Sequence, residues 1–260
     1  MATLKFYFSL LGTSIRAQVC LRGAFLMQVG LMLANNLIFF TMWWFFFNAF
    51  TSVGGWQVKD MIALLAIGGG SYGLLQIFFG GTRDLGKIIV NGNLDPFMTQ
   101  PKNILLHIAG SKSVAKGWGH IITTVFLIFF GNLTDLKTIG VICLSLCTGC
   151  LVFTSIRVIA HSVTFWLGPI EALSERYAES LFLFALYPTN IYSGILQLVM
   201  FTLIPAAVIT YLPVELIRDF SWEKAFILVA CGFAFSALAV FIFYQGLKRY
   251  ESGNQFGART

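Results

Sequence analysis

The chain has 260 residues, of which 57% are hydrophobic and only 11% are charged. Soluble domains carry roughly 25% charged residues, so this composition excludes an ordinary water-soluble globular protein. The net charge of +6 is explained better by membrane topology than by nucleic-acid binding, because Lys and Arg gather in cytoplasmic loops. We therefore expect an all-α membrane protein with a single transmembrane domain over residues 1–260, in contact with lipid and not with nucleic acid.

The first predicted element is a helix in the membrane interface over residues 4–21, where apolar residues recur at helical spacing among polar ones. A first membrane span follows over about 25–46 and closes with an aromatic run typical of the headgroup region. The second span, over about 61–79, contains Gly68, Gly69 and Gly70. These glycines either let a neighbouring helix approach closely or permit a bend.

Four further spans are predicted, and they lie over about 118–130, 139–158, 191–211 and 225–244. Two longer segments separate them, 81–117 and 168–190, and a polar tail covers 248–260. The second segment contains an amphipathic patch.

The distribution of basic residues predicts the orientation of the six spans. If the N-terminus is cytoplasmic, 13 of the 17 Lys and Arg residues fall on the inner side. The other four lie on the outer side and are Lys59, Lys137, Arg218 and Lys224. Since cytoplasmic loops are enriched in Lys and Arg, both termini and both long segments are expected to be cytoplasmic.

One short sequence imitates a nucleotide-binding motif. Residues 81–87 have the GxxxxGK frame of a phosphate-binding loop, but Ile88 follows where a hydroxyl would ligate magnesium. The preceding segment is also a predicted membrane span and not a buried strand. Cys143, Cys147 and Cys150 share one helical face without a nearby histidine or carboxylate, which favours packing over metal binding. We expect no cofactor, metal or catalytic site in this chain.

The most informative stretch is IIVNGNLDPFMTQP, residues 88–101. An apolar turn leads to Gly92, and Asp95, Pro96 and Pro101 follow. Prolines end helices and Asp favours turns, so we predict a short helix or turn held at Asp95. A rigid, partly apolar projection at the membrane surface is something that a soluble partner can grip; the alternative is an ordinary loop.

This stretch resembles the cytoplasmic segment of the type-2 ABC exporter permeases, in particular a bacterial subfamily of about 260 residues with six spans. The family pattern G-x-L-D-x-x-(L/M)-x-x-P is matched by Gly92, Leu94, Asp95, Met98 and Pro101. Similar family landmarks surround the fifth predicted span: Tyr187-Pro188, Ile191-Tyr192, Ile204-Pro205-Ala206, and Tyr211 with Pro213.

The resemblance implies a non-catalytic permease subunit of the bacterial cytoplasmic (inner) membrane. Such a subunit pairs with a second permease, identical or related, and with separate ABC ATPase subunits that bind ATP and magnesium. The segment after the second span would act as a coupling helix that docks on the ATPase. The residues assigned to it are Lys87, Asn91, Gly92, Asn93, Leu94, Asp95, Pro96, Met98 and Pro101. The bend at Pro205, together with Tyr211 and Pro213, would shape an external gate.

Two other functions are weighed against this one. A channel or ion-coupled carrier usually places ionisable residues within its spans, and the predicted spans here are nearly free of them. An integral-membrane enzyme acting on lipid would need a convergent polar cluster, for which the candidates are His161, Glu171, Glu175 and Arg176, without a recognised spacing. The permease is therefore the favoured interpretation.

Overall fold

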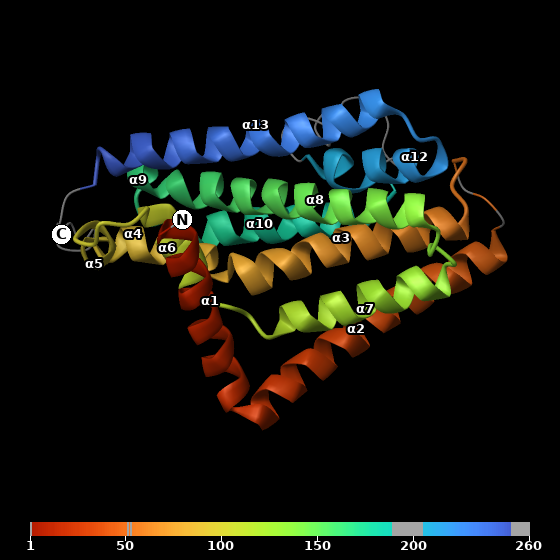
Figure 1. Cartoon of the computed structure of the whole chain (residues 1–260), viewed down its shortest axis with the longest axis horizontal. Coiled ribbons are helices and arrows are strands. Elements are labelled where there is room, and N and C mark those ends of the chain that lie inside the picture. The colour runs from red at the N-terminus through yellow and green to blue at the C-terminus, as the bar shows by residue number, and fades with distance from the viewer. Residues whose placement is uncertain (1, 51, 53, 189–204, 251–260) are drawn as a thin grey trace.

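A computed structural model describes residues 2–50, 52, 54–188 and 205–250, and this part of the chain is a bundle of helices without a β-strand (Figure 1). In chain order the elements are α1 (Ala2–Cys20), α2 (Arg22–Ala49), α3 (Val58–Phe78), the 3-10 helix η1 (Gly80–Asp84), α4 (Leu85–Val90), α5 (Asp95–Met98), α6 (Ile104–Gly110), α7 (Lys116–Phe130), α8 (Leu136–Ser162), α9 (Thr164–Leu167), α10 (Glu171–Ala185), the π-helix η3 (Ala207–Tyr211), α12 (Leu212–Arg218) and α13 (Trp222–Leu247).

Within the described residues, four helices are long and apolar enough to cross a membrane. They are α2, α3, α8 continued by α9, and α13, which correspond to the first, second, fourth and sixth predicted spans. The third predicted span is the shorter apolar helix α7. Most of the fifth, residues 191–204, lies outside the described residues, so the number of six spans stays a prediction.

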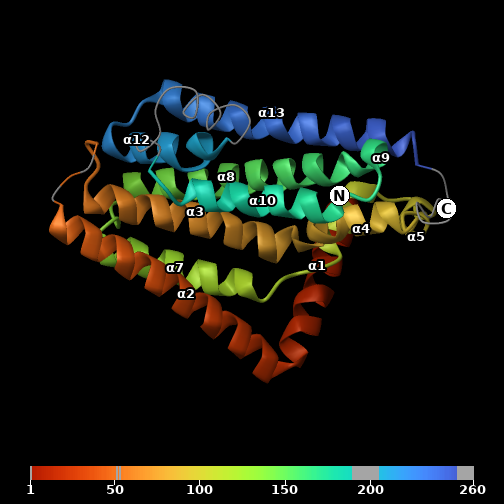
Figure 2. The ribbon, with the colours of Figure 1, turned by 180° about the vertical axis from the view of Figure 1, so that it is seen from behind.

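Helices α3, α8 and α13 run in one direction and α2, α7 and α10 in the other, so the connections gather at the two ends of the bundle (Figures 1 and 2). One end carries η1, α4–α6, α9 and the end of α13, and the start of α1 lies beside α6. We call it the α6 end. The other carries α12 and the connections that follow α2 and α7, and we call it the α12 end. The placement of the α6 end in the cytoplasm, with both termini, stays a prediction.

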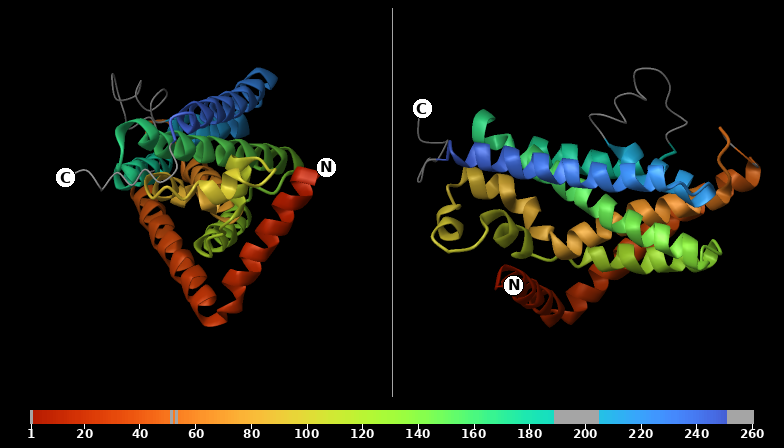
Figure 3. Two further views of the ribbon diagram at one scale, coloured as in Figure 1. Left: turned by 90° about the vertical axis from the view of Figure 1, so that its left-hand side faces the viewer. Right: turned by 45° about the horizontal axis from the view of Figure 1, so that its top comes forward.

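Helix α1 lies across the long direction of the bundle at the α6 end and meets α2 at a sharp corner (Figures 1 and 3). Tyr7 and Leu11 are buried, and the Tyr7 hydroxyl donates a 2.6 Å hydrogen bond to the carbonyl oxygen of Phe78. Leu4 and Phe8 of the same helix are exposed. This packing is the kind expected of an amphipathic helix at an interface.

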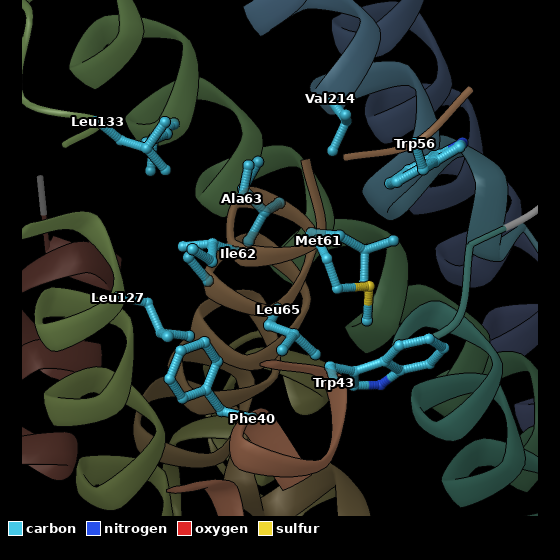
Figure 4. Packing of buried hydrophobic residues seen from close by; sticks show 14 of the residues in the cluster. Phe40, Trp43, Trp56, Met61, Ile62, Ala63, Leu65, Leu127, Leu133 and Val214 are labelled. Carbon is cyan, nitrogen blue, oxygen red and sulfur yellow. The ribbon is translucent and has the colours of Figure 1, made fainter. Parts of the chain in front are cut away.

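The core of the bundle forms around α3, whose side chains are buried along most of its length. Figure 4 shows residues of the largest buried cluster, in which Phe40 and Trp43 of α2 and Leu127 of α7 surround Met61 and Ile62 of α3. Since these side chains come from helices far apart in sequence, the cluster joins α2, α3 and α7 into one body.

Close contact explains the glycines in α3. A Cβ atom on Gly70 would lie 2.5 Å from a methyl carbon of Leu146 in α8 and 2.7 Å from the hydroxyl oxygen of Thr124 in α7. The helix is uninterrupted from Val58 to Phe78. Of the two alternatives given by the sequence, Gly70 therefore serves close helix approach and not a bend.

The amphipathic patch within residues 168–190 forms α10, which packs lengthwise against α8 (Figure 2). Ser174, Leu181 and Ala185 are buried, and the Ser174 hydroxyl donates a 2.8 Å hydrogen bond to the carbonyl oxygen of Ala160. The segment is thus part of the bundle over its helical half, whereas its side of the membrane stays a prediction.

Candidate functional site

The segment between α3 and α7 folds into short helices at the α6 end. Its first turn of interest follows α4, where Gly92 has a φ of +68°. The Gly92 N–H donates to the carbonyl of Ile89 at 3.2 Å, and the Asn93 N–H donates to that of Ile88 at 2.9 Å. These two bonds form a Schellman motif, which requires a left-handed residue and therefore favours glycine. Gly92 ends α4 and reverses the chain.

Leu94 and Asp95 hold the next turn against the bundle. Leu94 is fully buried in a cluster with Leu85 of α4 and Phe243 of α13. The Tyr250 hydroxyl donates to the Asp95 carboxylate at 3.1 Å and accepts from the Leu94 N–H at 3.3 Å. Burial raises the pKa of the Tyr250 hydroxyl, so it stays protonated as a donor. No sequence pattern predicted that a residue just after α13 would supply this anchor.

The remaining predicted residues form the outward face of the same segment. Six of them are exposed: Lys87, Asn91, Asn93, Pro96, Met98 and Pro101. Met98 has 46% of its surface exposed and is the apolar member of this set apart from the prolines. We call these six residues the outer face and the set of Leu94, Asp95 and Tyr250 the anchor. A contact made on the outer face therefore acts on a turn that is fixed to α13.

The GxxxxGK frame has a packing explanation in this fold. A Cβ atom on Gly81 would collide with the carbonyl oxygen of Ile108 in α6, and one on Gly86 would lie 2.7 Å from Nδ1 of His161. Both glycines therefore permit close contact between η1, α4 and their neighbours, which accounts for them without a bound phosphate.

The three residues assigned to a gate lie together around η3, near the α12 end. Pro205 is buried just before η3, Tyr211 is its last residue, and Pro213 is buried in the first turn of α12. Proline supplies no backbone N–H at position 213, which removes one helical bond. A π-helical turn beside it widens the helix locally, and such turns often occur at functional sites.

An ion pair and a backbone contact connect this region to the first turn of α3 and to the turn before it. Arg218 of α12 donates to both carboxylate oxygens of Asp60, at 2.8 and 2.6 Å, and to the carbonyl of Gly55 at 3.0 Å. Its guanidinium lies 5.1 Å from the ring centre of Trp56, which is fully buried. The bond to Asp60 raises the pKa of Arg218 further above its usual range. The Tyr211 ring lies 6.2 Å from the Trp56 ring, so this turn also contacts η3.

Behind α4, charged side chains from η1, α8 and α10 meet beside the Tyr72 hydroxyl of α3. Arg157 of α8 is 2% exposed, and Glu175 of α10 lies 3.9 Å from it. The same carboxylate lies 3.0 Å from Nε of Arg83 in η1 and 3.2 Å from Nε2 of His161. Arg157 also donates to the hydroxyl of Tyr72 in α3 at 2.9 Å. We call these five residues the charged cluster. A buried ionisable residue in a predicted span is a functional candidate.

A cavity of about 470 Å³ opens beside this cluster, and we call it the Glu171 cavity. The four residues weighed for a lipid enzyme, His161, Glu171, Glu175 and Arg176, all line it. The described lining holds no serine or cysteine, and Glu175 is already engaged by cations. Glu175 is therefore held by its contacts with Arg83 and His161.

Sequence reasoning named His161 and Glu175 as polar candidates but did not join them to Arg157, although the signal for that contact is present. Arg157 and His161 are four residues apart in α8, and Glu171, Glu175 and Glu179 follow one another at the same spacing in α10. Residues four apart share a helix face, so a basic face and an acidic face could have been matched. The prediction of 168–190 as a segment outside the spans hid this match.

The segment after α3 and the region around η3 carry the sequence patterns that resemble one family. A family model described as ABC-2 family transporter protein matches residues 31–254. The chain belongs to this family. No curated protein and no solved structure gave a significant match. The matched range of this ABC-2 family protein includes the outer face, the charged cluster and η3, whereas α1 precedes it.

Proposed function

We propose that this ABC-2 family protein is the permease subunit of an ABC exporter, and that its outer face docks on a separate ATPase subunit. The observation that supports this most is the division of the segment into an exposed face and a buried anchor. Coupling requires a partner to push on a surface that does not yield. The anchor meets that need, because Leu94 is buried and Asp95 and Leu94 both bond to Tyr250.

Motion of the segment would be passed on through direct contacts. Helix α4 packs on α8 and α9, and its cluster includes Val158 of α8 and Ala239 of α13. Arg83, two residues before α4, pairs with Glu175 of α10. Binding and hydrolysis of ATP and magnesium by the ATPase would thus tilt several helices together, as a rigid-body change between two packings.

The α12 end is the expected exit side. The π-helix η3 and Pro213 provide a helix that is already locally widened, and the Arg218–Asp60 pair holds it against the turn before α3. Opening of an exporter would require the helices at this end to separate. The π-helix η3 is the element there that can deform. Release to the outside is the direction that this arrangement supports.

A second permease subunit, identical or related, would complete the transporter in the bacterial inner membrane. Helix α2 exposes large apolar side chains over much of its length, including Leu26, Leu31, Ile38 and Phe45. In a membrane, such a face contacts lipid or another apolar helix. The exposed face of α2 can therefore contact lipid or an apolar helix of the second permease subunit.

The test changes two residues of the turn that carries the outer face, in the complex purified from its own membranes. Asp95→Ala combined with Pro96→Ala should leave membrane insertion intact and abolish stimulation of the ATPase by the permease. The control is Leu136→Ala, since Leu136 is 88% exposed at the opposite end of the bundle. Full stimulation in the double variant, or repeated purification of the chain without any ATPase that carries a Walker motif, would contradict the proposal.

A further inference from the structure

A second cavity, of about 270 Å³, lies next to the charged cluster and is lined from five helices. Met32 of α2, Tyr72 of α3, His120 of α7, Arg157 of α8 and Phe182 of α10 contribute to its wall. We call it the Arg157 cavity. A cavity of this volume has room for a small polar head group.

The charged groups that line this cavity are mostly cationic. Arg83, Lys116 and Arg157 face one carboxylate, Glu179. Glu175 lies behind the wall, 3.9 Å from Arg157 and 3.0 Å from Arg83, and counting it still leaves one positive charge in excess. Lys116 is exposed at the start of α7, whose first turn holds no acidic residue. The positive end of that helix adds to the excess.

Arg157 has unused donor capacity in this wall. It is 2% exposed, and one terminal nitrogen donates to the Tyr72 hydroxyl at 2.9 Å. Its Nε is buried and has no hydrogen-bond partner among the described residues. A buried donor left unpaired costs free energy, and a guanidinium suits the oxygens of a phosphate or carboxylate. An anion in the cavity would meet the part of the guanidinium that lines the wall, whereas Nε itself is enclosed by protein atoms.

Other side chains in the wall are apolar. Met32, Val114, Phe182 and Leu183 line it, and Leu183 is largely exposed at the edge of the bundle. The rings of Phe182 and Tyr72 stack with their centres 4.0 Å apart. Helix α2 packs closely against α7 but diverges from α10 toward the α6 end (Figures 1 and 2). An apolar chain attached to a bound anion can therefore lie along Leu183 toward the lipid.

We propose that the Arg157 cavity binds an amphiphilic anion: a phosphate or carboxylate group held by Arg157 and Lys116, with an apolar chain along Met32 and Leu183. The identification of this molecule as the transported substrate rests on the proposed function. Its binding requires only this chain. Arg83 lines both this cavity and the Glu171 cavity and precedes α4, so it links the anion site to the segment that would meet the ATPase.

The direct test is calorimetric titration of the full chain, purified in a neutral maltoside detergent without any ATPase. Dodecyl phosphate should bind at least about tenfold more tightly than dodecyltrimethylammonium, which has the same chain and the opposite charge. Inorganic phosphate at an equal concentration should not displace it, because it lacks the apolar part. Equal affinity for the cation, or displacement by inorganic phosphate, would overturn the proposal.

Variants assign the site to these residues. Lys116→Gln changes an exposed side chain and should weaken dodecyl phosphate binding about tenfold, the loss expected for one close charge. Arg157→Lys keeps the charge but loses the planar fork and should weaken it at least as much. The control is Lys112→Gln, whose ammonium pairs with Asp84 and does not line the cavity. If Arg157→Lys fails to fold, Lys116→Gln decides.

Unchanged affinity in Lys116→Gln would overturn the assignment. Because the titration contains no ATPase, its result is separate from that of the docking experiment. A chain that stimulates its ATPase but binds the two amphiphiles equally would keep the permease function and lose the anion site. A chain that binds dodecyl phosphate selectively but never binds an ATPase would keep the anion site and lose the permease function.

Discussion

Single contacts determine how firmly the segment between α3 and α7 is attached to the helix bundle, and so whether its motion is passed to the other helices. The Tyr250 hydroxyl contacts one backbone group, the Leu94 N–H, and one side chain, the Asp95 carboxylate. Both lie more than 150 residues away in sequence. Gly81 allows α6 to lie directly against η1. Neither Tyr250 nor Gly81 is a residue of the outer face. Both determine how firmly it is held.

Removing the Tyr250 hydroxyl tests the anchor. Tyr250→Phe should cost about 1 kcal/mol of local stability, the usual net value of one hydrogen bond, and should raise amide exchange over residues 92–99 roughly fivefold. Hydrogen exchange by mass spectrometry measures this directly. In a double-mutant cycle with Asp95→Ala, the second change should add less than it does alone. Fully additive effects would mean that the two side chains do not interact.

Filling the space at Gly81 tests the contact with α6. Gly81→Ala should lower the unfolding free energy by about 2 kcal/mol, because its methyl group meets a backbone carbonyl that cannot turn away. Gly140→Ala is the matched control, since a Cβ atom there meets nothing within 4 Å. Thermal unfolding of both variants in detergent gives the comparison. Equal midpoints would show that η1 and α6 are not closely packed.

Among the elements, α10 carries the largest difference between expectation and structure. The sequence predicted an amphipathic patch within residues 168–190 but not its partner, and the structure shows a helix that packs on α8 and brings Glu175 to Arg157. The pattern alone could not distinguish a face that meets water from one that meets buried cations. Gly92, in contrast, was predictable as a turn, because a left-handed residue after a short helix favours glycine.

The α8–α10 contact predicts unequal effects for two neighbouring glutamates. Glu175→Gln leaves Arg157 buried with less compensation and should cost about 3 kcal/mol of unfolding free energy. Glu179→Gln, one turn further along α10, removes only a 3.7 Å contact with the exposed Arg83 and should cost less than about 1 kcal/mol. Denaturation midpoints of the two variants report the difference. A larger loss for Glu179→Gln would contradict the described packing.

The attachment of α12 to the turn before α3 predicts a similar contrast. Arg218→Gln removes the bidentate bond to Asp60 and the contact with Trp56, and should cost about 2 kcal/mol. Lys224→Gln should change little, because its nearest carboxylate oxygens lie 3.9 and 4.0 Å away. Trp56 fluorescence should shift toward that of an exposed indole only in the first variant. The same shift in both would exclude a special role for Arg218.

At the scale of the whole molecule, hydropathy predicted where the apolar helices lie but not how their ends assemble. The helical class and the positions of α2, α3, α8 and α13 followed from apolar runs. The gathering of α1, α4–α6 and the end of α13 at the α6 end depends on long-range packing, such as that of Tyr250 on Leu94. Such contacts leave no periodic pattern in a single sequence, so the outer face was predicted without its anchor.

The account depends most on where the ATPase contacts the permease. A photo-crosslinking amino acid placed at Met98, in the complex purified from its own membranes, should attach to the ATPase, whereas the same group at Leu136, exposed at the opposite end, should not. Mass spectrometry of the crosslinked peptide identifies the partner. Efficient crosslinking from Leu136, with none from Met98 in an intact complex, would contradict docking on the outer face.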